Sequence, residues 1–146
     1  MVSKQFLDAI RSHAASACAF ESAMYAALQR EREELQDRLP ERSIARQRLT
    51  EIRDRLAKYE RSLVELRLWA VSDKDLAHRL PQLEDGLVLL QAEEERLVSE
   101  RERAEASYSL QEQEVFKITS RHRAADLERE AVCGLLLAME QMDLED

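Results

Sequence analysis

The sequence predicts an all-α protein, a long antiparallel two-helix coiled-coil hairpin with its tip near residues 71–73. Only two glycines and two prolines occur in 146 residues, and 36% of the residues are charged against 5% aromatic, which is typical of coiled coils and long helices. Leucines recur at heptad spacing on both sides of the midpoint, and the heptad register changes once, at residues 71–75. We therefore expect a single domain, 1–146, with a first arm at 4–70 and a second arm at 73–142.

In the first arm, apolar side chains recur every seven residues between positions 45 and 70. They form two stripes that alternate at spacings of three and four, a pattern that keeps an apolar seam facing a partner helix. The stripes are Leu49, Leu56 and Leu63, and Ala45, Ile52, Tyr59 and Leu66. Upstream, charged residues take the seam positions, and Pro40 predicts a kink or a break near Leu39 because proline lacks an amide donor and clashes with the preceding turn.

The tip is predicted from the change of register in VSDKD, residues 71–75. Ser72 followed by Asp75 resembles a capping box, and Asp73 places a negative charge where a helix N-terminus favours one. A second helix is therefore expected to start at about Asp73. A short connection between two helices favours antiparallel neighbours, so we interpret 71–73 as the tip of a hairpin.

The second arm carries a seam across roughly nine heptads, with a polar middle at Glu94, Arg101 and Gln111. Charge favours pairing with the first arm. Residues 1–73 hold 13 basic and 12 acidic side chains, whereas residues 74–146 hold 9 and 18. A fold-back near residue 73 would place the Arg-rich stretch 42–67 beside the acid-rich stretch 84–105, and opposite charges beside a seam select pairing and orientation.

Several classes of function are excluded or disfavoured. A net charge of −8 argues against nucleic acid as a partner, because that affinity rests on neutralising phosphates. No run of apolar residues approaches a membrane span. His13, His78 and His122 share no ligand spacing with one another or with cysteine, so we expect no metal site, no cofactor and no catalytic residues, and hence no enzyme.

The two cysteines are isolated in sequence, which suits a reducing compartment and predicts a cytoplasmic protein. In the expected hairpin, Cys18 faces the neighbourhood of residue 128. Cys133 then lies roughly 7 Å further along the axis. A native disulfide is therefore not expected, and small buried side chains are the expected role.

Two apolar sets are candidate partner-binding surfaces. Leu68, Trp69 and Val71 crowd the tip, where the seam runs out of partner surface, and tryptophan is a frequent interface anchor. The competing interpretation is that Trp69 folds over the turn and closes the seam. The second set flanks the paired termini and comprises Phe6, Leu7, Ile10, Leu135, Leu136, Leu137 and Met139. Three consecutive leucines cannot all face one seam, so another chain, self-association or a bent N-terminal segment is expected to cover some of them.

In size, layout and its Arg/Glu-rich second arm, including LVLLQAEEERLVSERERAE (87–105) and RHRAADLERE (121–130), the chain resembles the FliJ/YscO-type stalk proteins of type III secretion systems. The resemblance implies a cytoplasmic, non-catalytic link between a hexameric export ATPase and the export gate, peripheral to a membrane-embedded apparatus. It also implies that the paired termini enter the ATPase ring and that the middle and the tip, including Trp69, contact the gate or chaperones. By position, the ring contacts would be Phe6, Leu7, Ile10, Leu135, Leu136 and Met139.

Two alternatives stay open. The chain could be a generic coiled-coil scaffold or oligomerising adaptor that self-associates through its apolar C-terminus. It could also be an α-helical secretion chaperone, if it folds back at Pro40 as well as at Ser72 to form a more compact bundle. The sequence also leaves open whether the helices pair within one chain or between chains.

Overall fold

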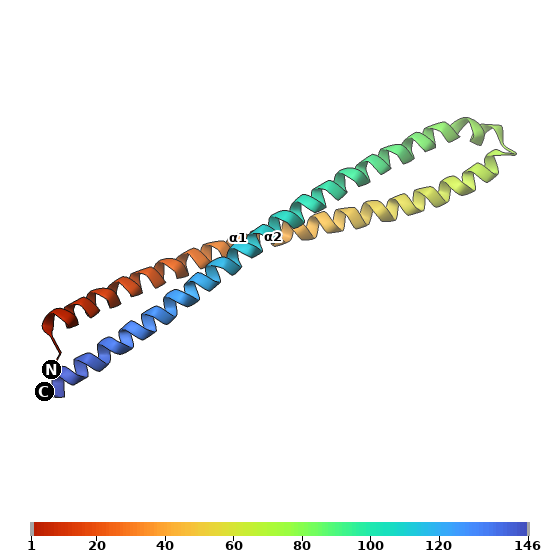
Figure 1. The fold of residues 1–146 in the computed structure, drawn as a ribbon. Helices are drawn as coiled ribbons and strands as arrows, with labels where there is room; N and C mark the ends of the chain where they lie inside the picture. Colours follow the sequence, from red (N-terminus) through yellow and green to blue (C-terminus); the bar gives the residue numbers. More distant parts are fainter. Residues whose placement is uncertain (1, 146) are drawn as a thin grey trace. The chain divides into compact units, whose positions relative to one another are not determined.

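The computed structural model describes residues 2–145, with side chains for residues 2–142. Helix α1 spans Lys4–Ala70 and helix α2 spans Lys74–Glu145, and residues 71–73 join them (Figure 1). The described residues contain no strand. The prediction of an all-α helical hairpin is confirmed, with both helices supplied by one chain.

The turn is built by backbone and side-chain hydrogen bonds. The Ser72 amide and hydroxyl both donate to the Trp69 carbonyl, at 3.2 and 3.3 Å. The Asp73 carboxylate accepts from the amides of Asp75 at 3.0 Å and Leu76 at 3.4 Å, so Asp73 is the N-cap of α2. The expected capping box at Ser72 and Asp75 is wrong, because Ser72 is used to end α1.

Pro40 lies inside α1 and does not end it. Of the two expected outcomes, a kink or a break, the break is therefore excluded. Proline removes one helical hydrogen bond, and α1 has 67 residues, many of them packed against α2, so a single lost bond does not terminate it. Pro81 is likewise contained within α2.

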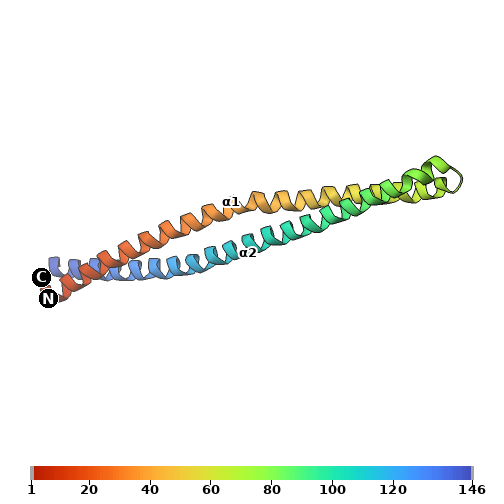
Figure 2. The same cartoon turned by 90° about the horizontal axis from the view of Figure 1, so that it is seen from above.

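The helical hairpin divides into two compact units, each made from both helices. The hairpin unit comprises Asp37–Ser109 and includes the turn. The terminal unit comprises the residues up to Gln36 and those from Leu110 onward. Within each unit the two helices run antiparallel, and the two helical ribbons can be followed in Figure 2.

The core of the hairpin unit is a narrow seam. Leu49, Ile52 and Leu97 form its buried cluster, against which Leu90 and Val98 pack. Further buried residues of α1 continue the two predicted stripes, namely Ala45, Leu56 and Leu63. The heptad pattern of residues 45–63 therefore correctly predicts the face of α1 that is buried against α2.

The core of the terminal unit is made from smaller side chains. Buried alanines contribute much of it, together with a few larger residues: Leu7, Ala14, Ala17, Leu28, Ala125, Met139 and the polar Gln111. Alanine presents only a methyl group, so the helices bury less apolar area here than in the leucine-rich hairpin unit.

Candidate interaction surfaces

The tip residues predicted to bind a partner are all exposed. Trp69 is 67% exposed, and Leu68 and Val71 are more exposed still. They follow the last buried leucine of α1, Leu63, and surround the turn that ends the pairing of the helices. The alternative, in which Trp69 folds over the turn, is not what the structure shows. A large aromatic side chain is thus left free beside two aliphatic ones.

The residues predicted near the paired termini divide between the seam and the surface. Leu7 and Met139 are buried between α1 and α2, and Ile10 and Leu136 are half-buried. Phe6, Leu135 and Leu137 are exposed, Leu137 to 60%. The three consecutive leucines do point to different sides, as helical geometry requires. Only the exposed members are accessible to a partner.

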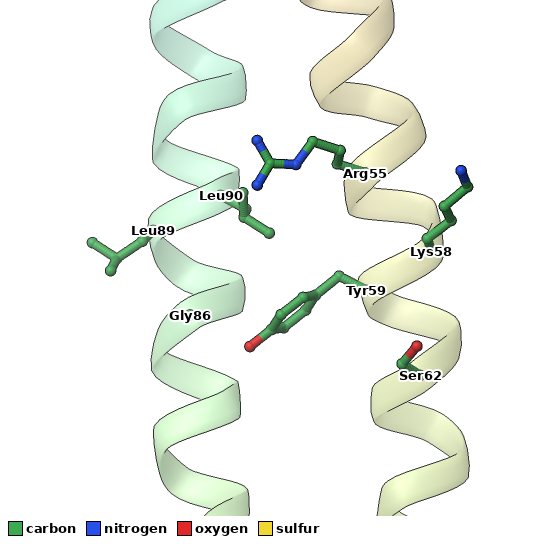
Figure 3. A pocket seen from close by; sticks show the side chains of 7 residues that line it. All are labelled: Arg55, Lys58, Tyr59, Ser62, Gly86, Leu89 and Leu90. Carbon is green, nitrogen blue, oxygen red and sulfur yellow. The ribbon is translucent and has the colours of Figure 1, made fainter.

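An open groove of about 570 Å³ lies between the helices in the hairpin unit. Figure 3 shows the ring of Tyr59 extending from α1 toward α2 at Gly86, and the Leu89 side chain directed away from it. The Tyr59 hydroxyl donates to the carbonyl of Leu83 in α2. A Cβ at position 86 would lie 2.5 Å from that hydroxyl, so the ring takes the space that glycine leaves. The remaining lining comes from Arg55, Lys58, Ser62 and Leu90.

Sequence reasoning did not find this groove, although a signal existed. Gly86 is one of two glycines, and a fold-back near residue 73 brings it opposite Tyr59, a seam position of α1. The lining combines the leucine side chains of α2 with two cationic side chains of α1, Arg55 and Lys58.

Ion pairs join the two helices of the hairpin unit in the predicted register. Arg67 pairs with Glu84 at 3.3 Å, Arg53 with Glu94 at 3.6 Å, and Arg46 hydrogen-bonds Glu105. The expectation that residues 42–67 lie beside residues 84–105 is confirmed. These groups are largely exposed, so each pair contributes little to stability and acts mainly on alignment.

The Arg46–Glu105 pair is the interhelical contact with the clearest electrostatic effect. The hydrogen bond from Arg46 lowers the pKa of the Glu105 carboxyl below its ordinary value, and nearby Arg42 and Arg101 act in the same direction. The same bond raises the pKa of the Arg46 guanidinium. Both shifts favour the charged forms that pair across the helices.

Polar residues replace the apolar seam at the end of the hairpin unit furthest from the turn. Arg38 donates to the hydroxyl of Ser107 at 2.6 Å and approaches its carbonyl at 3.4 Å. One turn later, the Arg42 guanidinium lies over the Tyr108 ring, 3.9 Å from its centroid. Arg38 and Arg42, which interrupt the heptad pattern of α1, therefore contact polar and aromatic side chains of α2.

The terminal unit contains polar layers of its own. Gln111 is buried and donates its side-chain amide to the Glu31 carbonyl at 2.9 Å and to the Glu31 carboxylate. His122 hydrogen-bonds Glu21 at 2.8 Å, and its ring lies 5.6 Å from that of Tyr25. Each layer joins α1 to α2 and can form only in one register.

The cysteines lie closer together than expected. The Sγ atoms of Cys18 and Cys133 are 3.9 Å apart, and both thiols are free. The two side chains meet although the residues are about five positions out of direct opposition in the expected hairpin, because side chains of paired helices can reach a residue about one turn further along the partner. The expected burial is wrong for Cys18, which is exposed, whereas Cys133 is half-buried.

The described residues offer neither a metal-binding cluster nor a membrane-spanning helix. They contain no group of three or more His, Cys, Asp or Glu placed to hold a metal ion. Nor does either helix, over the residues described, have an apolar stretch that could cross a bilayer.

Comparison with known proteins gives no match. The chain matches no family model, no curated protein and no solved structure.

Proposed function

We propose that this chain is a non-catalytic stalk or adaptor of a type III secretion export apparatus, linking the hexameric export ATPase to the export gate. The resemblance in size, layout and second-arm composition supports the proposal. The observation that carries it furthest is the exposure of Leu68, Trp69 and Val71 at the tip, together with that of Phe6 and Leu137 near the paired ends. Exposed aromatic and aliphatic side chains on a helical hairpin suit protein contacts.

The two apolar sets have different assigned partners. The terminal set, Phe6, Leu135 and Leu137, contacts the ATPase ring. The tip set contacts the gate or an export chaperone. Leu7 and Met139, which the resemblance also assigns to the ring, are buried in the seam and hold the terminal unit together instead.

The test is binding and ATPase stimulation with the export ATPase of the source organism. The double variant Phe6→Ala/Leu137→Ala should lose stimulation and bind at least about tenfold more weakly, because anchor residues contribute most of an interface's binding energy. Trp69→Ala should keep stimulation and lose binding to the gate. Phe116→Ala is the matched control, since Phe116 is an exposed aromatic outside both sets.

A generic oligomerising adaptor is the second candidate, favoured by the exposed Leu135, Leu137 and Met142. If the wild-type chain neither binds nor stimulates the ATPase, and light scattering shows an oligomer that Leu137→Ala dissociates, the adaptor replaces the stalk. The third candidate, a helical chaperone, required a fold-back at Pro40. Helix α1 continues through Pro40, so that bundle does not form.

A further inference from the structure

The terminal unit holds two cysteine thiols against one another. Cys18 of α1 and Cys133 of α2 are 115 positions apart in sequence, yet their Sγ atoms are 3.9 Å apart. Cys18 is exposed and Cys133 half-buried, so Cys18 is the residue more accessible to a reagent in solution. This arrangement is independent of the proposed stalk function.

The packing around the thiols lets the helices approach closely. Ala14 and Ala17 of α1 and Ala125 of α2 are buried within the same unit. A disulfide needs Cα atoms within about 7 Å, and small side chains at a helix contact favour such a distance. Rotation of the two cysteine side chains can then close the remaining gap.

A salt bridge and a hydrogen bond between the helices fix the register on the two sides of the cysteines. Arg11 bonds Glu140 at 3.2 Å, before Cys18 in α1 and after Cys133 in α2. Glu21 bonds His122 at 2.8 Å on the opposite side. The two helices therefore cannot slide past one another without breaking contacts that bracket the thiols.

We propose that Cys18 and Cys133 form a redox modification site, in which a hydroperoxide oxidises the pair to a reversible disulfide that ties α1 to α2. Cys18 is the first nucleophile because it is the exposed thiol. The pKa of the Cys133 thiol is raised, mainly by burial and secondly by its contact with Cys18. Cys133 therefore stays protonated while Cys18 reacts with the peroxide, and acts as the resolving thiol in the second step.

The reaction balances with hydrogen peroxide as the only co-reactant. The Cys18 thiolate attacks one peroxide oxygen, the O–O bond breaks, and a sulfenic acid and one water form. Cys133 then attacks the sulfenic sulfur, the S–S bond forms, the S–O bond breaks, and a second water leaves. The two thiols together lose two electrons and two protons, and the peroxide is reduced to two waters. A low-molecular-weight thiol reverses the reaction by exchange.

The experiment uses the reduced full-length chain and one equivalent of hydrogen peroxide. Titratable thiols should fall from two to none, the intact mass should fall by about 2 Da, and proteolysis should release the Cys18 peptide linked to the Cys133 peptide. Closure should be at least about tenfold faster in the folded chain than in urea, because folding places the thiols side by side.

Two matched variants complete the test. Cys18→Ser should react with peroxide more slowly than Cys133→Ser, and the latter should accumulate oxygen adducts in place of a disulfide. Mass gains of about 16 or 32 Da on the wild type without a linked peptide, or disulfides formed only between chains, would overturn the proposal. Equal closure rates in buffer and in urea would also overturn it.

Discussion

The hydroxyl of Tyr59 in α1 occupies the space where a side chain at position 86 of α2 would stand. A Cβ built on Gly86 lies 2.5 Å from the hydroxyl oxygen and 3.3 Å from the ring carbon that carries it. The hydroxyl also donates to the Leu83 carbonyl, so the ring is held by a hydrogen bond as well as by shape. Gly86 is therefore a contact residue, despite the unfavourable helix propensity of glycine.

The first prediction compares the two glycines of α2. Gly134→Ala should stabilise the protein by about 0.5–1 kcal/mol, because nothing within 4 Å opposes a new Cβ and alanine favours a helix. Gly86→Ala should be neutral or destabilising, since displacing Tyr59 loses a hydrogen bond worth about 1 kcal/mol. Chemical denaturation followed by circular dichroism at 222 nm measures both. An equal gain from the two substitutions would contradict the assigned contact.

The second prediction concerns the seam of the hairpin unit. Leu49 is 2% exposed, so Leu49→Ala should lower the free energy of unfolding by about 2–4 kcal/mol through lost burial and the cavity left behind. Leu89 is 72% exposed, and Leu89→Ala should change stability by less than about 0.5 kcal/mol. Comparable losses from the two variants in the same denaturation assay would mean that the seam is placed on the wrong face of the helices.

The heptad pattern was sufficient to predict the hairpin and the leucine seam. Leu49, Leu56 and Leu63 recur every seven residues, and all three are buried. The opposite charges of the two arms also predicted the correct neighbours, as the Arg67–Glu84 pair demonstrates. Both signals work because burial and charge act on whole faces of a helix, which sequence periodicity describes well.

Contacts that depend on stagger or on a single side chain were not predicted. The Cys18–Cys133 contact joins residues that are about five positions out of direct opposition, and a heptad pattern does not show which side chains reach that far along the partner helix. At Arg38 and Arg42 the sequence indicated only a weak seam. The hydroxyl of Ser107 and the ring of Tyr108 that receive them lie about 70 residues away, beyond the reach of local patterns.

The third prediction addresses Gln111, a buried polar residue in the terminal unit. Gln111→Leu removes its bonds to Glu31 and fills the seam with an apolar side chain. Because Glu31 is only half-buried and its carboxylate can bind water instead, stability should change little. Register and partner selection should weaken, because a single buried polar layer specifies both in coiled coils. Light scattering should therefore show a change in mass, or additional oligomeric species, relative to the wild type. A single species of unchanged mass, together with a large loss of stability, would refute this role.

The last prediction uses acid to test the Arg46–Glu105 pair. Glu105 titrates in unfolded chains near pH 4.3, roughly its ordinary pKa. The hydrogen bond from Arg46 lowers that pKa in the folded protein, so the folded state binds fewer protons than the unfolded state over this range. The pair therefore contributes stability that is fully present above the unfolded pKa and is lost as the pH falls through the folded one.

Acidification from about pH 6 to pH 3 should consequently lower the thermal midpoint of the wild type more than that of Glu105→Gln, which carries no titrating carboxyl at this position. Arg46→Gln should flatten the profile in the same direction but less completely, because it removes the largest cause of the lowered pKa and leaves the smaller contributions of Arg42 and Arg101. Glu102→Gln, which alters another exposed carboxylate of α2, should retain the wild-type slope. If Glu102→Gln and Glu105→Gln flatten the profile equally, the acid response comes from net charge rather than from the interhelical pair, since each removes one negative charge from the same helix.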